Sequence, residues 1–145
     1  MKKTHVMLHH SLTADSGSVS WGAIRKYHVE TNGWKDIGYH LGFERVGDYD
    51  EGLLGRPFDE DGAHCYQDGM NRISLGVCFV GDFDSASPPV SLLQYAARQL
   101  RSIMADLAVP ADEAHVRMHR QHATYKTCPG ARFPYTDFVR MLREG

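Results

Sequence analysis

The stretch ISLGVCFVG, residues 73–81, is the most strand-like part of the chain and decides its fold. It is apolar almost throughout, whereas a strand with one side in water alternates apolar and polar residues. A continuous apolar run of this length is typical of a central strand that is buried on both faces. We therefore expect the rest of the chain to cover both faces of the sheet that contains it.

Other strand-like and helical segments lie on both sides of this run. Strand-like patterns occur at 4–10, at 37–45, after the turn VGDYDEG (46–52), and at 115–119. Apolar residues at helical spacing indicate helices over about 20–31, 89–107 and 134–144. Strands and helices thus alternate irregularly around one central strand. This predicts an α/β (mixed) fold, one domain over residues 1–145, with a central mixed β-sheet of about five strands and helices packed on its faces.

Two of these segments give more detailed expectations. In 37–45, strict alternation places Tyr39 on the same strand face as the next two alternate residues, Leu41 and Phe43. In 20–31, Ser20 is the expected N-cap residue. The expected inner face of that helix is formed by Ala23, Ile24 and Tyr27.

The bulk composition restricts the class of protein. Of 145 residues, 42% are hydrophobic and 23% are charged, as in an ordinary globular domain, and the net charge of −2 gives no overall case for a nucleic-acid partner. No apolar run reaches the length of about 18 residues that a membrane-spanning helix needs, so we expect no stable membrane insertion. The apolar core of about 7–15 residues that a signal peptide requires is also missing. We therefore expect synthesis in the cytoplasm.

The three cysteines are an odd number, which together with a cytoplasmic origin argues against a disulfide framework. Cys128 lies in HATYKTCPG (122–130), close to several histidines. A catalytic zinc ion takes three protein ligands with nitrogen or sulfur donors and leaves a fourth position for water. Because no compact Cys-x-x-Cys spacing is present, such ligands could converge only by folding. The residues alone leave open both a His/His/Cys zinc site and scattered histidines with a buried cysteine.

Four motifs in series resemble one known family. They are LHHSLT (8–13), GWKDIGYHLGF (33–43), GAHCYQDGMNRISLGVCFVGDF (62–83) and HRQHATYKTCPG (119–130). In this order they resemble the zinc-dependent type-2 N-acetylmuramoyl-L-alanine amidases, which include the small amidase-type lysozymes of bacteriophages and the peptidoglycan recognition proteins of animals. The resemblance spans nearly the whole chain. In the length of the chain, and in the lack of a separate cell-wall-binding domain, the protein looks most like the phage lysozymes.

The resemblance implies a role for seven residues. It implies one zinc ion held by His9, His119 and Cys128, catalytic roles for Tyr39 and Lys126, and substrate-binding positions at His64 and Asn71.

The ligand assignment leaves one alternative. The stretch from His119 to Cys128 is about one residue longer than in the phage lysozymes, which makes His122 the alternative second ligand. We prefer His119, because the end of a strand holds a ligand more rigidly than a loop does. His10 falls on the opposite side of its strand from His9 and is not an expected ligand.

The chemistry of these residue types fits an amide hydrolase. Zinc lowers the pKa of its bound water towards about 7 and polarises a carbonyl. A Lys126 ammonium would stabilise the oxyanion that forms on attack. Tyr39 would orient the water, deprotonate it, or donate a hydrogen bond, and the sequence does not separate these roles. The implied reaction is hydrolysis of the amide between N-acetylmuramic acid and the L-alanine of the stem peptide in peptidoglycan.

The implied protein is an endolysin of a phage or prophage. It would be a monomer that reaches the cell wall through a separate, holin-type membrane pore. One alternative is a non-catalytic peptidoglycan-binding module, but family members of that kind typically replace the cysteine ligand, often with serine. A second alternative is regulation of the phage RNA polymerase through an N-terminal extension. Only eight residues precede His9, so we do not expect it.

Overall fold

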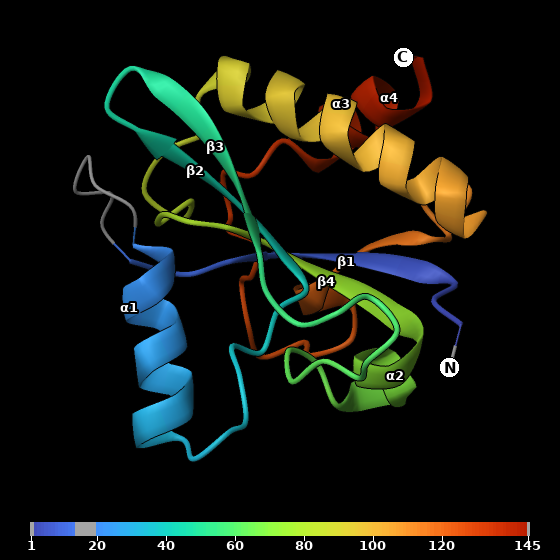
Figure 1. The fold of residues 1–145 in the computed structure, drawn as a ribbon. Helices are drawn as coiled ribbons and strands as arrows, with labels where there is room; N and C mark the ends of the chain where they lie inside the picture. The colour runs from blue at the N-terminus through green and yellow to red at the C-terminus, as the bar shows by residue number, and fades with distance from the viewer. Residues whose placement is uncertain (1, 14–19, 145) are drawn as a thin grey trace.

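The strand β4 (Ser74–Phe79) is the middle strand of a five-stranded sheet, and all six of its residues are buried. The computed structural model describes residues 2–13 and 20–144. Figure 1 shows the strands crossing the middle of the molecule in the order β3-β2-β4-β1-β5. The other four strands are β1 (His5–His10), β2 (Leu41–Val46), β3 (Tyr49–Leu54) and β5 (Val116–Met118). The central position predicted from the sequence for residues 73–81 is confirmed.

The sheet is mixed, as expected. β4 pairs in parallel with β1 and with β2, and β1 pairs in parallel with β5. Only the β2–β3 hairpin is antiparallel among the pairings described. The described helices are α1 (Trp21–Lys26), continued by a π-helical turn (Tyr27–Thr31), and then α2 (Met70–Ile73), α3 (Val90–Leu107) and α4 (Tyr135–Glu144). Two 3-10 turns cover Gln67–Gly69 and His119–Gln121.

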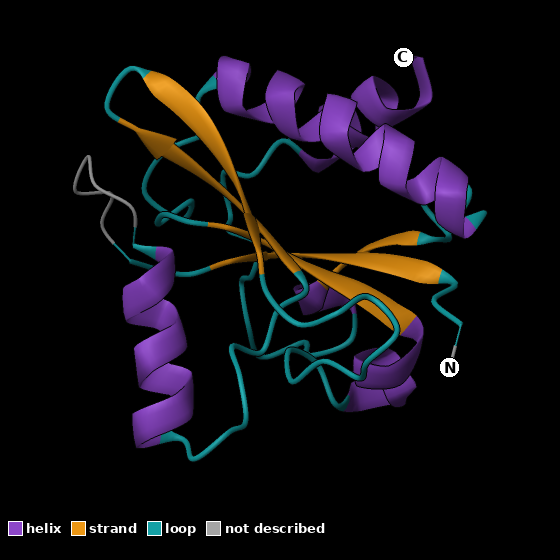
Figure 2. Ribbon diagram, in the orientation of Figure 1, coloured by secondary structure: helices purple, strands orange, loops and turns teal. Residues whose placement is uncertain are grey.

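Alternation along the parallel strands divides the sheet into two faces with different roles. Leu75, Val77 and Phe79 of β4 enter the main hydrophobic core. Their neighbours Gly76 and Cys78 therefore face the opposite side of the sheet. Figure 2 shows α3 and α4 along one side of the sheet, with α1, α2 and most of the long loops on the other.

The core side is closed by the apolar faces of α3 and α4. α3 buries six apolar residues at helical spacing, namely Leu92, Leu93, Ala96, Ala97, Leu100 and Met104. The ring of Phe79 packs edge-on against Phe133 and Phe138, at centroid distances of 5.0 Å and 5.5 Å. The residues that line α3 and α4 thus cover the core face of β4. α1, α2 and most of the long loops lie on the opposite side of the sheet.

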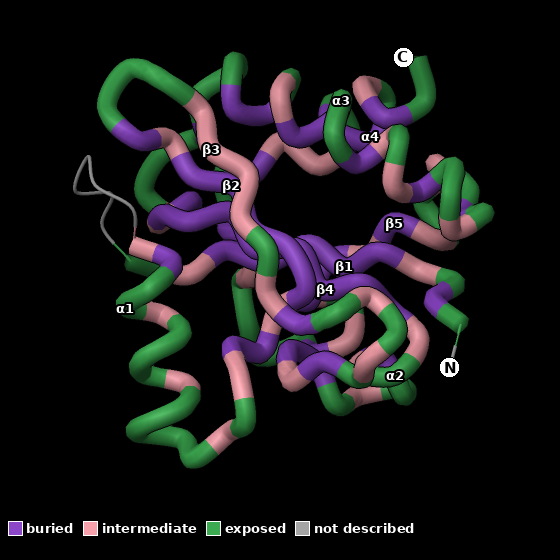
Figure 3. The backbone as a smooth tube through the Cα atoms, in the orientation of Figure 1, coloured by how far each residue is buried: buried purple, intermediate pink, exposed green. Residues whose placement is uncertain are grey.

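The predicted inner face of the helix over 20–31 is confirmed at Ile24 and wrong at Ala23 and Tyr27. Trp21, Ile24 and His28 are buried or half-buried, whereas Ala23 and Tyr27 are exposed. Figure 3 shows that most of α1 is exposed. Trp21 sets the phase, because its indole N–H donates to the carbonyl of Leu54 at 2.9 Å. Ser20 stands at the expected cap position, but its side chain makes no capping hydrogen bond.

The predicted position of Tyr39 beside Leu41 and Phe43 is also wrong. β2 begins only at Leu41, and the chain bends at Gly38 and at His40 just before it. Tyr39 consequently packs against the cluster that contains Trp21 and Cys78, on the side of the sheet away from α3 and α4.

Within residues 2–13 and 20–144, no helix combines the length and the apolar character needed to cross a bilayer.

The contact between Trp21 and Gly42 predicts opposite effects for two glycine substitutions. A Cβ atom at Gly42 would lie 2.4 Å from the Trp21 ring, whereas a Cβ atom at Gly22 would meet nothing within 4 Å. We expect Gly42→Ala to lower the free energy of unfolding by about 1–3 kcal/mol through overpacking. Gly22→Ala, the control within α1, should leave it unchanged or raise it by up to about 1 kcal/mol. Urea denaturation measures both, and equal effects would contradict the proposed packing.

Candidate active site

The register of the parallel strands β1 and β5 brings His9 and His119 together at the carboxyl ends of these strands. Leu8 of β1 is paired with Met118, the last residue of β5, so His9 and His119 follow side by side. Their ring centroids are 4.6 Å apart. The loop after β5 returns so that Cys128 Sγ lies 3.6 Å from His9 Nδ1. One donor atom from each of His9, His119 and Cys128 lies within 4.8 Å of the other two. The structure therefore brings together the three predicted metal ligands.

The protonation states of these residues suit a metal site. Burial first, and then the nearby His64 and His119, lower the pKa of His9 well below its ordinary value. Burial also lowers the pKa of His119, to about 4. Both imidazoles are thus neutral at pH 7 and have a free lone pair. Burial raises the pKa of the Cys128 thiol to about 12, so a metal would have to displace its proton.

The donor set fits zinc. Two imidazole nitrogens and one thiolate are ligands that zinc prefers, and three protein ligands leave a position for water or substrate. The backbone N–H of His10 points at Cys128 Sγ across 3.3 Å and would stabilise a thiolate there. The His10 ring itself faces elsewhere, since its Nδ1 accepts a hydrogen bond from the backbone N–H of Phe83 at 3.1 Å.

His122 lies outside the cluster of His9, His119 and Cys128, which we call the metal group. Its Nδ1 is 2.6 Å from the carboxylate of Asp68, and its Nε2 accepts a hydrogen bond from Arg117 at 3.2 Å. Both ring nitrogens are therefore bonded to residues other than His9, His119 and Cys128. His115 likewise pairs with Asp112 at 2.6 Å. This geometry favours His119 over His122 as the second ligand.

The metal group opens into a cavity of about 480 Å³. Its lining includes the three ligands and three of the other predicted site residues, namely Tyr39, His64 and Lys126. Asn71 lines an adjoining cavity of about 290 Å³, which shares His64, His119 and Lys126 with the first. All seven predicted site residues therefore lie along one continuous concave surface.

Tyr39 stands beside the first ligand, with its ring centroid 5.2 Å from that of His9. Burial, followed by the nearby thiols of Cys78 and Cys128, raises the pKa of Tyr39 well above its ordinary value. Its hydroxyl is consequently protonated at neutral pH and is hydrogen-bonded to Cys78, while the residue lines the cavity.

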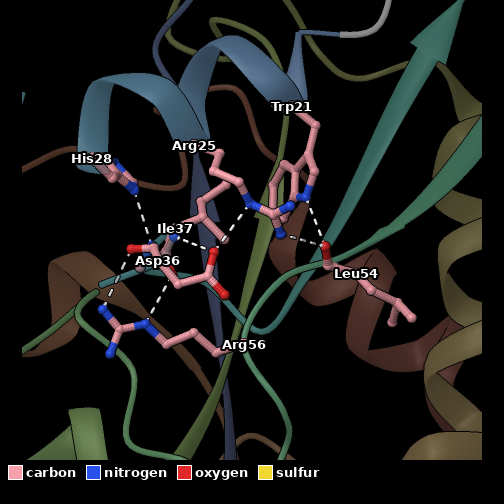
Figure 4. Close-up of polar contacts among 8 residues, drawn as sticks. Trp21, Arg25, His28, Asp36, Ile37, Leu54 and Arg56 are labelled. Carbon is pink, nitrogen blue, oxygen red and sulfur yellow. Dashed lines mark hydrogen bonds and ion pairs between the residues drawn. The ribbon is translucent and has the colours of Figure 1, made fainter. Parts of the chain in front are cut away.

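The segment that leads into Tyr39 is fixed by a polar network, shown in Figure 4. The Asp36 carboxylate accepts from the backbone N–H of Ile37 at 2.7 Å and from Arg25 of α1 at 3.0 Å. The buried Arg56 donates to the Ile37 carbonyl at 2.8 Å. His28 Nδ1 accepts the backbone N–H of Gly38 at 2.9 Å. These contacts tie α1 to the bend that places Tyr39.

Lys126 lies on an exposed loop that is fastened at its base. The Asp84 carboxylate accepts hydrogen bonds from the Thr127 hydroxyl at 2.9 Å and from the backbone N–H of Ala131 at 2.8 Å. The backbone N–H of Arg120 donates to the carbonyl of Cys128 at 2.9 Å. The loop can therefore hold Cys128 in place, while the Lys126 side chain lines the cavity with its Nζ 5.6 Å from the centroid of the Tyr125 ring.

The structure adds two residues to the site that the sequence analysis missed. His28 and Trp34 line the main cavity, with ring centroids 4.7 Å apart. The missed signal is the i, i+3, i+7 spacing of Trp21, Ile24 and His28, which marks the true inner face of the helix.

The fold and the site together define an α/β protein in which three residues that could hold a metal ion line an open cavity. A family model described as N-acetylmuramoyl-L-alanine amidase matches residues 1–131. The chain therefore belongs to the type-2 N-acetylmuramoyl-L-alanine amidase family, as its motifs indicated.

Individual relatives agree with this assignment. The chain is 33% identical over 127 residues to the endolysin of Klebsiella phage KP32 (87% of this chain, 80% of that protein) and 32% identical over 125 residues to the endolysin of Escherichia phage T7 (86% and 78%). Its fold is similar to that of Drosophila PGRP-LB, with a TM-score of 0.76, 30% identity, and coverage of 90% of this chain and 76% of that one. It also resembles the amidase LysC of Clostridium intestinale, with a TM-score of 0.82, 22% identity, and coverage of 99% and 87%.

The ligand assignment predicts different zinc contents for two histidine variants. His119→Ala should lose most bound zinc, since two ligands hold it far less tightly than three. His122→Ala, the matched control three residues away, should keep about one equivalent, because its ring faces Asp68 and Arg117. Metal analysis after dialysis measures both, and zinc loss in His122→Ala alone would reverse the assignment.

The pKa values predict how many protons zinc displaces. At pH 6 both ligand histidines are already neutral, with His119 at about 4, whereas the Cys128 thiol is protonated, with a pKa of about 12. Binding should release about one proton, so that affinity rises about tenfold per pH unit between about pH 5 and 6.5. Calorimetric titration in buffers of different ionisation enthalpy gives the count. Release of two or more protons would contradict neutral histidines.

Proposed function

We propose that the chain is a zinc-dependent peptidoglycan amidase, which hydrolyses the amide between N-acetylmuramic acid and the L-alanine of the stem peptide. One observation carries the proposal: the donor atoms of His9, His119 and Cys128 converge at the wall of a cavity that Tyr39 and Lys126 also line. Membership of the amidase family and similarity to two phage endolysins support the same reaction.

Zinc held by His9, His119 and Cys128 would supply a Lewis acid and would lower the pKa of a water molecule towards about 7. Two neutral histidines and one thiolate would leave such a centre with a net charge of about +1, so that it would remain electrophilic. In this proposal the Lys126 ammonium stabilises the negative charge that develops on the amide oxygen. Tyr39, held protonated by its surroundings, donates a hydrogen bond to the reacting oxygen atoms.

The elongated shape of the site suits a muropeptide. The two adjoining cavities run from the metal group past Lys126 to Asn71, which gives an extended stem peptide a path beyond the scissile bond. We propose that His64 and Asn71 border this path as substrate-binding positions. A solved structure of a Drosophila PGRP-LB mutant, 28% identical with a TM-score of 0.78, is a complex with tracheal cytotoxin. A structure of PGRP-LE contains the same ligand, which is a monomeric diaminopimelic acid-type peptidoglycan.

The relatives also suggest where the enzyme acts. We propose a monomeric, single-domain endolysin over residues 1–145, made in the cytoplasm and released to the cell wall through a holin-type pore. The endolysins of phages KP32 and T7 are the relatives that support this setting.

The proposal is tested by incubating purified protein with peptidoglycan, with and without a chelator. We expect new amino termini on L-alanine, their loss on chelation, and their return when zinc is added. Binding to peptidoglycan without new termini would instead indicate a recognition protein. Cleavage that survives complete zinc removal would refute the metal-dependent mechanism.

The roles of the two residues beside the metal predict a selective loss of turnover. Lys126→Ala should lower kcat by about 100- to 1,000-fold, the usual effect of removing one oxyanion donor. Tyr39→Phe should lower kcat as well, and both variants should retain zinc because neither side chain is a ligand. Lys26→Ala, on the exposed surface of α1, is the control and should keep full activity. Zinc loss in Lys126→Ala would show that the lysine supports the metal group instead.

A further inference from the structure

The two ring nitrogens of His9 face different partners. Nδ1 lies 3.6 Å from Cys128 Sγ, on the side of the metal group. Nε2 lies 2.9 Å from Nδ1 of His64. Both rings are almost completely buried, with 1% of His9 and 8% of His64 exposed. A neutral imidazole carries one N–H group and one lone pair, so the partner of one nitrogen decides what the other can do.

A chain of hydrogen bonds continues from His64 into the protein. Its Nε2 lies 3.5 Å from Ser74 Oγ, and the Ser74 hydroxyl donates to the backbone carbonyl of Met70 at 2.6 Å. A carbonyl oxygen can only accept, so the Ser74 proton points to Met70 and the Ser74 oxygen is left to accept from His64. His64 then carries its proton on Nε2, and its Nδ1 accepts the proton of His9 Nε2.

We propose that His64 is a positioning residue for the metal centre, which holds His9 in the tautomer whose Nδ1 lone pair faces the metal. The inference rests on the proposed zinc site and goes beyond the substrate-binding role considered above. In the opposite arrangement, a proton on His64 Nδ1 would force the proton of His9 onto its own Nδ1, where it would block metal binding. Partners of this kind, which orient a ligating histidine through its second nitrogen, strongly affect metal affinity.

The surroundings leave the His64 ring a single place to lie. A Cβ atom at Gly76 of β4, or at Gly62 in the preceding loop, would come within 2.5 Å of the His64 ring. Two positions that lack a side chain therefore form the slot for the imidazole. The Asn71 side-chain oxygen accepts the backbone N–H groups of His64 and Cys65 at 2.6 Å and 2.7 Å, which fixes the backbone that carries the ring.

The same loop is anchored to the start of β1. The ammonium of Lys3, 2% exposed, donates to the backbone carbonyls of Glu60 and Arg72 at 2.8 Å and 2.9 Å. Lys3 lies two residues before β1, which carries His9, so one continuous segment presents the candidate ligand and anchors the loop that orients it. A ring that only touched substrate would need neither the slot nor a buried partner for each of its nitrogens.

The test measures zinc affinity by competition with a chromophoric chelator, separately from activity. His64→Leu should weaken zinc binding by about 10- to 100-fold, the usual effect of losing such a partner. His64→Asn, whose side-chain oxygen can take the place of Nδ1, should recover most of that loss. The visible spectrum of the cobalt-substituted protein should change in His64→Leu and return towards wild type in His64→Asn.

A third variant keeps the test independent of how well His64→Leu folds. Ser74→Ala removes the far end of the chain at a residue that lines neither site cavity, so a substrate contact cannot explain its effect. We expect it to weaken zinc binding by several-fold, with metal-free stability followed by urea denaturation as the folding control. Unchanged zinc affinity in both His64→Leu and Ser74→Ala would overturn the proposal, and a raised KM for muropeptide would then identify His64 as a substrate contact.

The outcome for the wild-type protein separates this inference from the proposed function. Wild-type protein that binds zinc but releases no L-alanine termini would refute the amidase while the positioning role is still judged by the variants. Wild-type protein that binds no zinc would overturn both.

Discussion

The parallel pairing of β1 with β4 and β5 is the constraint on which the rest of the molecule depends. It fixes which side of the sheet each residue of β1 faces, with Val6 and Leu8 in the core and His9 in the site. It also sets the level of the strand ends, which puts His119 beside His9. A shift of one residue in this register would turn His9 towards the core and turn Val6 and Leu8 towards the cavity.

Much of this architecture could be predicted from the sequence, because it depends on patterns that are local. The apolar run of β4 and the helical spacing of α3 are complete within single segments, and the resemblance of four motifs to a known family supplied the candidate ligands. The spacing of Trp21, Ile24 and His28 carries a local signal for the inner face of α1, but the contact that fixes this face, Trp21 with Leu54, joins distant segments. The position of Tyr39 could not be predicted from local patterns, because it depends on the bend at Gly38, which lies against Ala63. The link between His9 and His64 is equally non-local, since 55 residues separate the two rings.

Several loops that form the site have a backbone held by polar side chains, of which Arg56 is buried and the others are partly buried. Arg56 and Asp36 fix the approach to Tyr39, Asn71 fixes the backbone at His64, and Asp84 fixes the base of the loop with Cys128. Most of these side chains bind backbone groups, which would otherwise lose hydrogen bonds in such tight turns. The reacting groups are thereby held on irregular segments almost as firmly as on the strands.

The loop between His119 and Cys128 is attached near both ends and exposed in the middle, where the Tyr125 hydroxyl accepts a hydrogen bond from Gln67 at 3.5 Å. His122 is held by Asp68 near one end, and Thr127 by Asp84 near the other, while Thr124 and Tyr125 between them are exposed. A residue gained or lost in that short span leaves both attachments, and hence the ligands, where they are. Evolution can therefore vary the length of this loop, and so the rim of the groove that meets the cell wall, without rebuilding the metal centre.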